Sequence, residues 1–294
     1  MKLKALALVA SLLAAPAIAQ PIYIDIGTNF GGNTNKAAGP TTTGFINELQ
    51  FNYYSWSTVY DGNNNGIGAG DIITSTGGLK GSGFNNFADL FGDNLITKLL
   101  PAFGPSDNGF GNLWHLSFGF DNLVGVLDGS GGVQWQSGTI SFYATTDVNN
   151  CVTTNTIGCF TQLFDMNVQG GGNIPSGTVL TGYLENFNET DDFNGVLAGD
   201  VFNLKRGATS SSFLDVNKEL ALKGQQQAFN FRVDQNVTDL PAFQSYDPLT
   251  QTFTLQQAEH RGGISFSVPE PTSVAVLGLG LLGLGFSRRN KKAN

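Results

Sequence analysis

The 294-residue sequence predicts an all-β protein, most simply an antiparallel β-sandwich of jelly-roll character with a short helical insertion. Three observations favour this fold class. Short runs alternate apolar and polar residues, which gives a strand one buried and one solvated face. The chain contains 39 Gly residues, and Gly and Asn accept the positive φ angles that tight turns require. No repeat of roughly 20 to 50 residues indicates a solenoid or a propeller.

The N-terminal segment 1–19 has the organisation of a helical signal peptide. Lys2 and Lys4 precede an apolar run, and Ala17 and Ala19 provide the small-x-small pattern that signal peptidase accepts. We therefore expect export and cleavage after Ala19. The first residue of the mature chain is then Gln20.

Nine runs have the composition and alternation of strands. In the clearest of them, Phe229, Phe231 and Val233 share one face, whereas Asn230 and Arg232 share the other. The spacing of the runs favours antiparallel pairing. The nine runs are 21–26, 45–56, 113–120, 133–146, 159–169, 178–187, 199–204, 227–233 and 263–268.

The interval 84–100 departs from this pattern and predicts a helical insertion. Its apolar residues recur at spacings of three and four, and Pro101 follows directly. Gly92, near the middle, can divide it into two short helices. We expect the insertion to cover an open edge or end of the sheets. A similar but shorter pattern predicts a second helix at 214–223.

Only two cysteines are present, Cys151 and Cys159, and they lie between two of the predicted strands. In an exported protein, two thiols at this separation predict a disulfide that closes a hairpin loop. The hairpin pairs residues 138–146 with residues 159–168. Zinc binding is the poorer alternative, because two Cys without a nearby His supply half a site.

The C-terminal segment 268–294 combines three features in order: an acid between prolines, an apolar Gly-rich stretch over 272–286, and a basic tail over 287–294. A helix that spans a bilayer needs about 20 apolar residues, so this stretch predicts a short transmembrane helix that inserts transiently. Positive charge favours the cytoplasmic side for the tail. The motif residues are Val268, Pro269, Glu270 and Pro271, and the basic residues are Arg288, Arg289, Lys291 and Lys292.

Together these features resemble the PEP-CTERM sorting signal of Gram-negative bacteria. The resemblance implies that an exosortase, a membrane-embedded cysteine protease, processes the protein near the motif after signal peptidase has acted. It also implies a host that makes exopolysaccharide. We therefore expect three segments: a signal peptide at 1–19, a β-sandwich body at 20–267 and a sorting signal at 268–294. The alternative is an ordinary C-terminal membrane helix.

The charge of the body bears on its partners. Six of the 15 Lys and Arg residues and one of the 23 Asp and Glu residues lie in the terminal segments, so residues 20–269 carry about −13. A nucleic-acid partner requires basic residues that displace phosphate counterions, so this class of function is excluded. Divalent cations and neutral glycans are compatible partners.

One Asp/Asn-rich loop resembles the start of a calcium loop of the EF-hand or dockerin kind. Asp61, Asn63, Asn65 and Asp71 place oxygen side chains at spacings that let a curled backbone aim them inward. A hydrophobic residue stands where a bidentate acid is expected. The alternative is therefore an Asn-Gly turn that leads into a strand, with the acids accepting backbone N–H groups. The pattern recurs at 192–200.

No local motif predicts catalysis. Ser130 follows Asp and Gly in the reverse of the order found in serine proteases, and His115 and His260 are isolated. Glycoside hydrolysis needs a carboxylate pair, which distant strands can supply. The candidates, by residue type alone, are Glu48, Glu185 and Glu189.

Three functional hypotheses follow. The first is a non-enzymatic protein of the cell surface or extracellular matrix, structural or adhesive, that associates with exopolysaccharide in a biofilm. The second is a calcium-assisted carbohydrate-binding module, and the third is a secreted polysaccharide hydrolase. Aromatic side chains either stack on sugars or pack in the core. They are Tyr53, Tyr54, Trp56, Tyr60 and Trp135.

Overall fold

The computed structural model describes most of the chain between residues 20 and 268. The described ranges are 20–31, 35–81, 95–101, 107–154, 157–174, 177–206, 208–234, 243–255 and 258–268. The predicted signal-peptide helix and the predicted C-terminal hydrophobic helix lie outside them. The described part is mostly β with few helices, as the sequence indicates.

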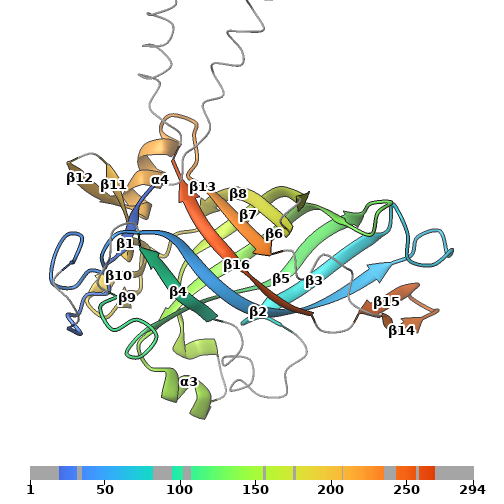
Figure 1. Ribbon diagram of the computed structural model, residues 1–294, viewed down its shortest axis with the longest axis horizontal. Coiled ribbons are helices and arrows are strands. Elements are labelled where there is room, and N and C mark those ends of the chain that lie inside the picture. Colours follow the sequence, from blue (N-terminus) through green and yellow to red (C-terminus); the bar gives the residue numbers. More distant parts are fainter. Residues whose placement is uncertain are drawn as a thin grey trace, which may run out of the picture.

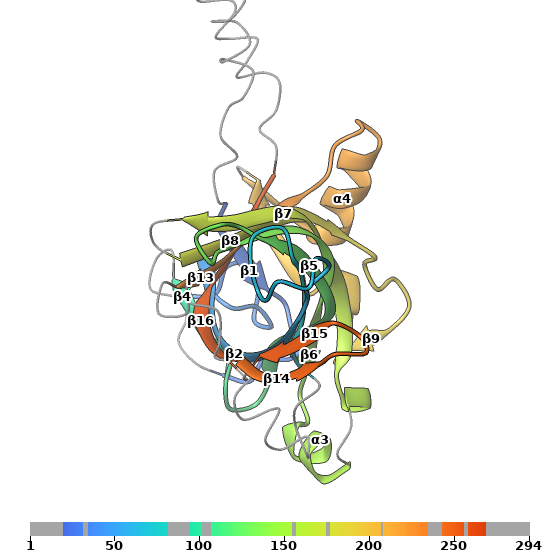
Figure 2. The ribbon, with the colours of Figure 1, turned by 90° about the vertical axis from the view of Figure 1, so that its right-hand side faces the viewer.

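Eight antiparallel strands form a closed barrel, whose long axis is horizontal in Figure 1 and points toward the viewer in Figure 2. Each strand pairs with the next, and β2 closes the ring by pairing with both β16 and β3. In order around the barrel, the strands are β2 (Ile46–Tyr60), β16 (Ala258–Ser267), β13 (Ala228–Asp234), β8 (Gly177–Glu185), β7 (Thr161–Ile174), β6 (Val133–Thr145), β5 (His115–Leu127) and β3 (Ile72–Gly78).

The closed barrel replaces the expected two-sheet sandwich. Strand β2 has 15 residues, long enough for its 49–55 part to pair with β16 and its 55–60 part to pair with β3. Register shifts in the β5–β6, β6–β7 and β7–β8 ladders increase the local twist and allow the sheet to curl. A sandwich and a barrel both bury alternate residues, so the alternation alone does not distinguish them.

Further strands extend from β2 and from the ends of the barrel (Figure 1). Next to β2 lies β1, followed by β11 and β12, and a β14–β15 hairpin joins the far end of β2. Strands β9 and β10 form a separate hairpin. The bounds are β1 (Ile22–Ile24), β9 (Asp192–Phe193), β10 (Val196–Leu197), β11 (Phe202–Arg206), β12 (Thr209–Ser212), β14 (Phe243–Asp247) and β15 (Thr252–Leu255).

The predicted helical insertion at 84–100 is wrong where the structure describes it. Strand β4 (Leu95–Pro101) pairs with β2, and residues 84–94 lie outside the described ranges. Ile96 pairs with Phe51 and Lys98 with Gln50, so Thr97 is the extra residue of a β-bulge. The bulge brings Ile96 and Leu99 to the same buried face. Their spacing of three, which indicated a helix, therefore belongs to a bulged strand.

The second predicted helix is present as α4 (Phe213–Ala221). Its N-cap is Ser212, whose hydroxyl accepts the backbone N–H of Asp215. Phe213 is fully buried and packs 5.1 Å, ring to ring, from Phe266 of β16. Helix α4 thus covers one end of the barrel core. The 3₁₀ helix η2 (Ala198–Asp200) lies beside it.

The barrel interior is filled by large apolar side chains. The predicted inward face of β13 is confirmed, because Phe229, Phe231 and Val233 are buried whereas Asn230 and Arg232 are exposed. Aromatic rings pack edge to face and in stacks, which adds to the hydrophobic stabilisation. Rings at the centre of this cluster are Phe51, Tyr53, Phe118, Phe120 and Phe231.

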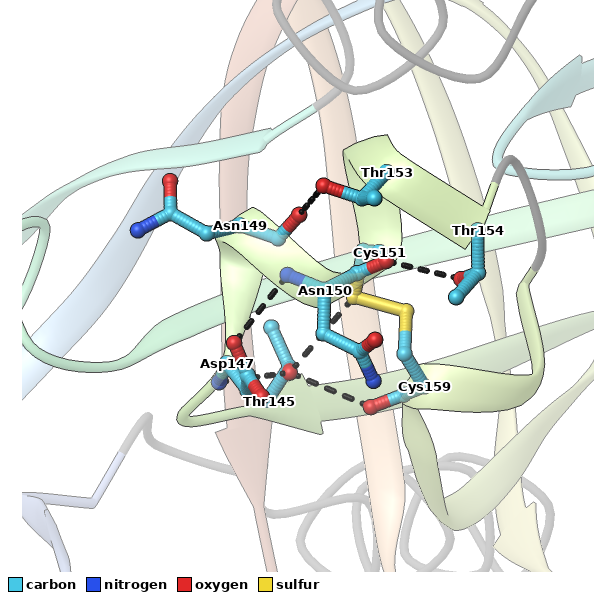
Figure 3. The surroundings of a disulfide bond; sticks show 8 residues. All are labelled: Thr145, Asp147, Asn149, Asn150, Cys151, Thr153, Thr154 and Cys159. Atoms are coloured by element: carbon cyan, nitrogen blue, oxygen red, sulfur yellow. Dashed lines mark hydrogen bonds between the residues drawn. A yellow bond between two sulfur atoms is a disulfide. The ribbon is translucent and has the colours of Figure 1, made fainter.

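The Cys151–Cys159 disulfide and the β6–β7 pairing are both as predicted. The disulfide joins α3 (Val148–Thr154) to η1 (Ile157–Cys159), and its Cα atoms are 5.2 Å apart. Thr145 lies at its base, where its hydroxyl donates to the carbonyl of Cys159 over 3.1 Å (Figure 3). The connection lies outside the barrel (Figure 2) and has an apolar cluster of its own beneath it. The disulfide thus stabilises a surface connection rather than the barrel core.

Candidate functional site

The two ends of the described body meet at one end of the barrel. The backbone N–H of Gln20, the predicted first residue of the mature chain, donates to the carbonyl of Phe266 over 3.2 Å. Ser267 pairs with Ala228 in the β13–β16 ladder, and Val268 is only 4% exposed in the core. The folded body therefore extends through Val268, the first residue of the predicted sorting motif.

The remaining predicted sorting residues lie outside the described ranges, as do Ala17 and Ala19 of the predicted signal cleavage site. Those C-terminal residues are Pro269, Glu270, Pro271, Arg288, Arg289, Lys291 and Lys292. None of the helices in the described ranges is long and apolar enough to cross a membrane.

A shallow groove of about 470 Å³ lies on the outer face of β7, β8, β13 and β16, which we call the outer groove. Its floor consists of two rows of residues that are paired across three adjacent strands. The rows are about 7 Å apart, because two residues separate them along each strand. One row is Tyr183, Ala228 and Ser267, and the other is Thr181, Asn230 and Ser265. The outer groove therefore reaches the last paired residue before the predicted sorting motif.

The shape of the outer groove follows from side-chain size. Ala228 lies between Tyr183 and Ser267, so a small side chain forms the low point beside a large ring. Beneath the groove, Gly182 faces the core, and a Cβ there would overlap the carbonyl of Asn167 on β7. Glycine thus permits the close approach of β7 and β8 that curves this part of the wall.

The polar groups of the outer groove are available for a ligand. The side chains of Tyr183, Asn230, Ser265 and Ser267 form no hydrogen bond with any residue within the described ranges. Tyr183 is 39% exposed. No local motif marks this site, although the alternation of Thr181 and Tyr183 on the polar face of a predicted strand is a signal for it.

The four predicted calcium ligands lie in the β2–β3 loop, where the side-chain oxygens of three of them accept backbone N–H groups. The carboxylate of Asp61 accepts from Asn65 over 3.2 Å and from Gly66 over 2.7 Å. The side chain of Asn63 accepts from Asn65 over 3.1 Å, and Asp71 accepts from Gly68 over 2.8 Å. These are the hydrogen bonds expected for an Asn-Gly turn that leads into a strand, the alternative to a calcium loop. Calcium binding by this loop stays a prediction.

The second copy of the pattern forms the two-residue turn of the β9–β10 hairpin. Asn194 and Gly195 have φ angles of 58° and 93°, as a type I′ turn requires. The carboxylate of Asp192 accepts the backbone N–H of Gly195 over 2.8 Å. The side-chain amide of Asn194 donates to the carbonyl of Ile26 over 2.8 Å, which ties the hairpin to the N-terminal segment.

A largely buried histidine lies inside the barrel, where the sequence indicated only isolated histidines. The ring of His260 stacks on Tyr53 with centroids 4.7 Å apart, and its Nε2 lies 2.6 Å from the hydroxyl of Ser55. Burial lowers the pKa of His260 to about 4, so the ring is neutral at pH 7. Burial also raises the pKa of Tyr53 well above its usual value. The Nδ1 of His260 is buried without a hydrogen-bond partner in the described part of the chain.

The other sequence candidates separate into core and surface residues. Tyr53 is buried, Trp135 packs against the core, and Tyr60 is 44% exposed near the opposite end of β2 from the outer groove. Glu185 accepts from the amide of Asn167 over 2.7 Å. Glu189 forms an ion pair with Lys218, whose pKa it raises.

The fold and its C-terminal end together define the class of the protein: a closed antiparallel barrel with a sorting signal directly after its last strand. Residues 267–289 match the PEP-CTERM protein-sorting motif, so the chain carries this signal. The motif implies an exosortase as processing partner and sorting to the cell surface of a Gram-negative bacterium. No curated protein and no solved structure matches the chain.

Proposed function

We propose that the protein is exported by its signal peptide, processed by an exosortase and retained at the cell surface or in the extracellular matrix. Its role there is structural or adhesive and involves exopolysaccharide. The observation that carries this proposal is the sorting motif at 267–289, which begins at the end of the last barrel strand. The barrel is thus a complete folded body that ends where the signal begins.

The position of Val268 refines the expected processing bond. Val268 is 4% exposed and packs in the core, and Ser267 is paired in the sheet. A protease requires an accessible, extended segment, which a buried residue of a sheet does not offer. We therefore expect cleavage beyond Val268, in or after the Pro-flanked part of the motif, with the barrel left intact.

A structural role is supported by the positions of two of the three candidate carboxylates. Glu185 is held by the Asn167 amide, and Glu189 is paired with Lys218. Both acids thus engage neighbouring side chains, and neither lines the outer groove. The acidic body disfavours anionic partners and is compatible with neutral polymers.

Deletion of residues 269–294 tests the sorting part of the proposal. We expect the truncated protein to be lost from the cell surface, because the exosortase then has no signal to recognise. Cell fractionation with an antibody against the body measures this distribution. A matched control is full-length Leu249→Ala, at a side chain that is 93% exposed and remote from the signal, which should be sorted normally. An identical distribution of truncated and full-length protein would contradict the proposal.

A further inference from the structure

We propose that the outer groove binds a segment of neutral polysaccharide, with Tyr183 as its stacking surface. This inference rests on the proposed function and specifies both the contact site and the class of polymer. The groove has a volume of about 470 Å³, which is within the range of roughly 300–1,000 Å³ typical of ligand sites. It is open to solvent along the sheet, as a site for an internal segment of a long chain must be.

The hydrogen-bonding groups of the groove suit a polyhydroxylated ligand. Asn230 offers an amide with two donors and an acceptor, and Ser265 and Ser267 offer hydroxyls that both donate and accept. None of the three side chains is engaged by another residue in the described ranges. A sugar presents donors and acceptors together on each hydroxyl, so these groups can be satisfied without a charge on either partner.

Tyr183 provides the apolar surface that sugar recognition also needs. Its side chain is 39% exposed at the edge of the groove and makes no ring stacking or hydrogen bond in the described part of the protein. An aromatic ring buries a large area with little loss of conformational entropy. The small Ala228 beside it leaves the space that a stacked sugar ring would occupy.

The charges around the groove favour a neutral over an anionic polymer. Among the described residues, none that lines the groove is charged, although the body carries about −13. The nearest cationic position on β13 is Arg232, one row beyond Asn230 and outside the lining. An anionic chain would meet long-range repulsion from the body without a compensating ion pair in the groove.

The groove is also rigid, because the three strands of its floor, β8, β13 and β16, are joined by backbone hydrogen bonds in an unbroken register. Preorganised groups lose little conformational entropy on binding. The groove lies beside Ser267, close to the point where the sorting signal begins. A polymer bound there lies close to the site of attachment or release of the mature protein.

Affinity electrophoresis of the mature protein tests the inference. The probes are the neutral and the anionic fractions of the exopolysaccharide of the producing bacterium, separated by ion exchange. We expect the neutral fraction to retard the wild type and Tyr183→Ala to bind it at least about tenfold more weakly. Tyr183→Phe should keep most of the affinity, because it keeps the ring. The matched control is Leu222→Ala, at a side chain that is 90% exposed at the end of α4 and outside the groove, and it should bind as the wild type does.

Several outcomes would overturn the inference: no retardation of the wild type by the neutral fraction, unchanged binding by Tyr183→Ala, or a preference for the anionic fraction. A change of oligomeric state in Tyr183→Ala would assign the groove to a second copy of the chain. Failure to remove the sorting signal in Tyr183→Ala would assign it to the exosortase. Surface labelling of the same variants measures sorting, whereas affinity electrophoresis of purified protein measures polysaccharide binding. A variant that is sorted normally but binds weakly therefore has a defect in the groove and not in sorting.

Discussion

Replacing Phe231 with Ala should lower the free energy of unfolding by about 4 kcal/mol. Phe231 is fully buried in the barrel, stacked on Phe51 at 4.4 Å and in edge contact with Phe118 at 5.2 Å. The substitution removes the side chain at the centre of this cluster and leaves a cavity that a closed barrel cannot collapse to fill. Urea denaturation at pH 7 measures the difference.

Two controls separate cavity formation from a general sensitivity of the protein. Phe231→Leu keeps most of the volume and should cost less than about 1.5 kcal/mol. Leu249→Ala, at a side chain that is 93% exposed, should change the free energy of unfolding very little. A loss below about 1 kcal/mol for Phe231→Ala would contradict the packing described for the barrel interior.

The second large effect concerns acid stability and His260. Its folded pKa is about 4, against 6.5 for the free side chain, so between these values the unfolded chain binds a proton that the folded barrel does not. The stabilisation from neutral His260 is therefore complete above pH 6.5 and is lost as the pH falls toward 4. We expect the free energy of unfolding to fall by about 2 kcal/mol over this range. This is less than the full pKa difference would give, because part of the ring is exposed.

His260→Gln keeps a neutral polar group beside Ser55 and should remove most of this pH dependence. The matched control is His115→Gln, because burial also lowers the pKa of His115, although that side chain is only half-buried. Carboxylates with a lowered pKa, such as Glu219 at about 2 against 4.5 for the free side chain, lose their stabilisation mainly below pH 4.5. Urea titrations at pH 7, 5.5 and 4.5 provide the comparison. If the free energy of unfolding of His260→Gln falls with pH as steeply as that of the wild type, the histidine does not cause the loss of stability.

Local sequence patterns predicted the elements whose formation depends on residues that are close together in the sequence. All nine predicted runs contain a strand, because alternation records which face of a strand is buried. The β6–β7 hairpin and its disulfide were also predictable, because the partners are close in sequence. Helix α4 was predicted correctly, and its Ser212 cap explains where it begins.

The features that sequence patterns did not predict depend on long-range pairing or on departures from regular geometry. The sequence of β3 is rich in Thr, Ser and Gly, and it forms a strand because β2 and β5 flank it. Barrel closure depends on the two different partners of β2, which no local pattern encodes. The bulge at Thr97 gave β4 the spacing of a helix. The outer groove depends on which strands become neighbours, so its residues are scattered over β7, β8, β13 and β16.

Export and processing of the chain at both ends are tested by one measurement. It is the intact mass of the protein recovered from the surface of the producing cells, before and after reduction. We expect a chain that begins at Gln20, ends beyond Val268 and lacks the basic tail. Reduction should add the mass of two hydrogens, from the Cys151–Cys159 disulfide. A chain from the cell surface that retains both terminal segments, or recovery of the protein from the cytoplasm alone, would contradict this expectation.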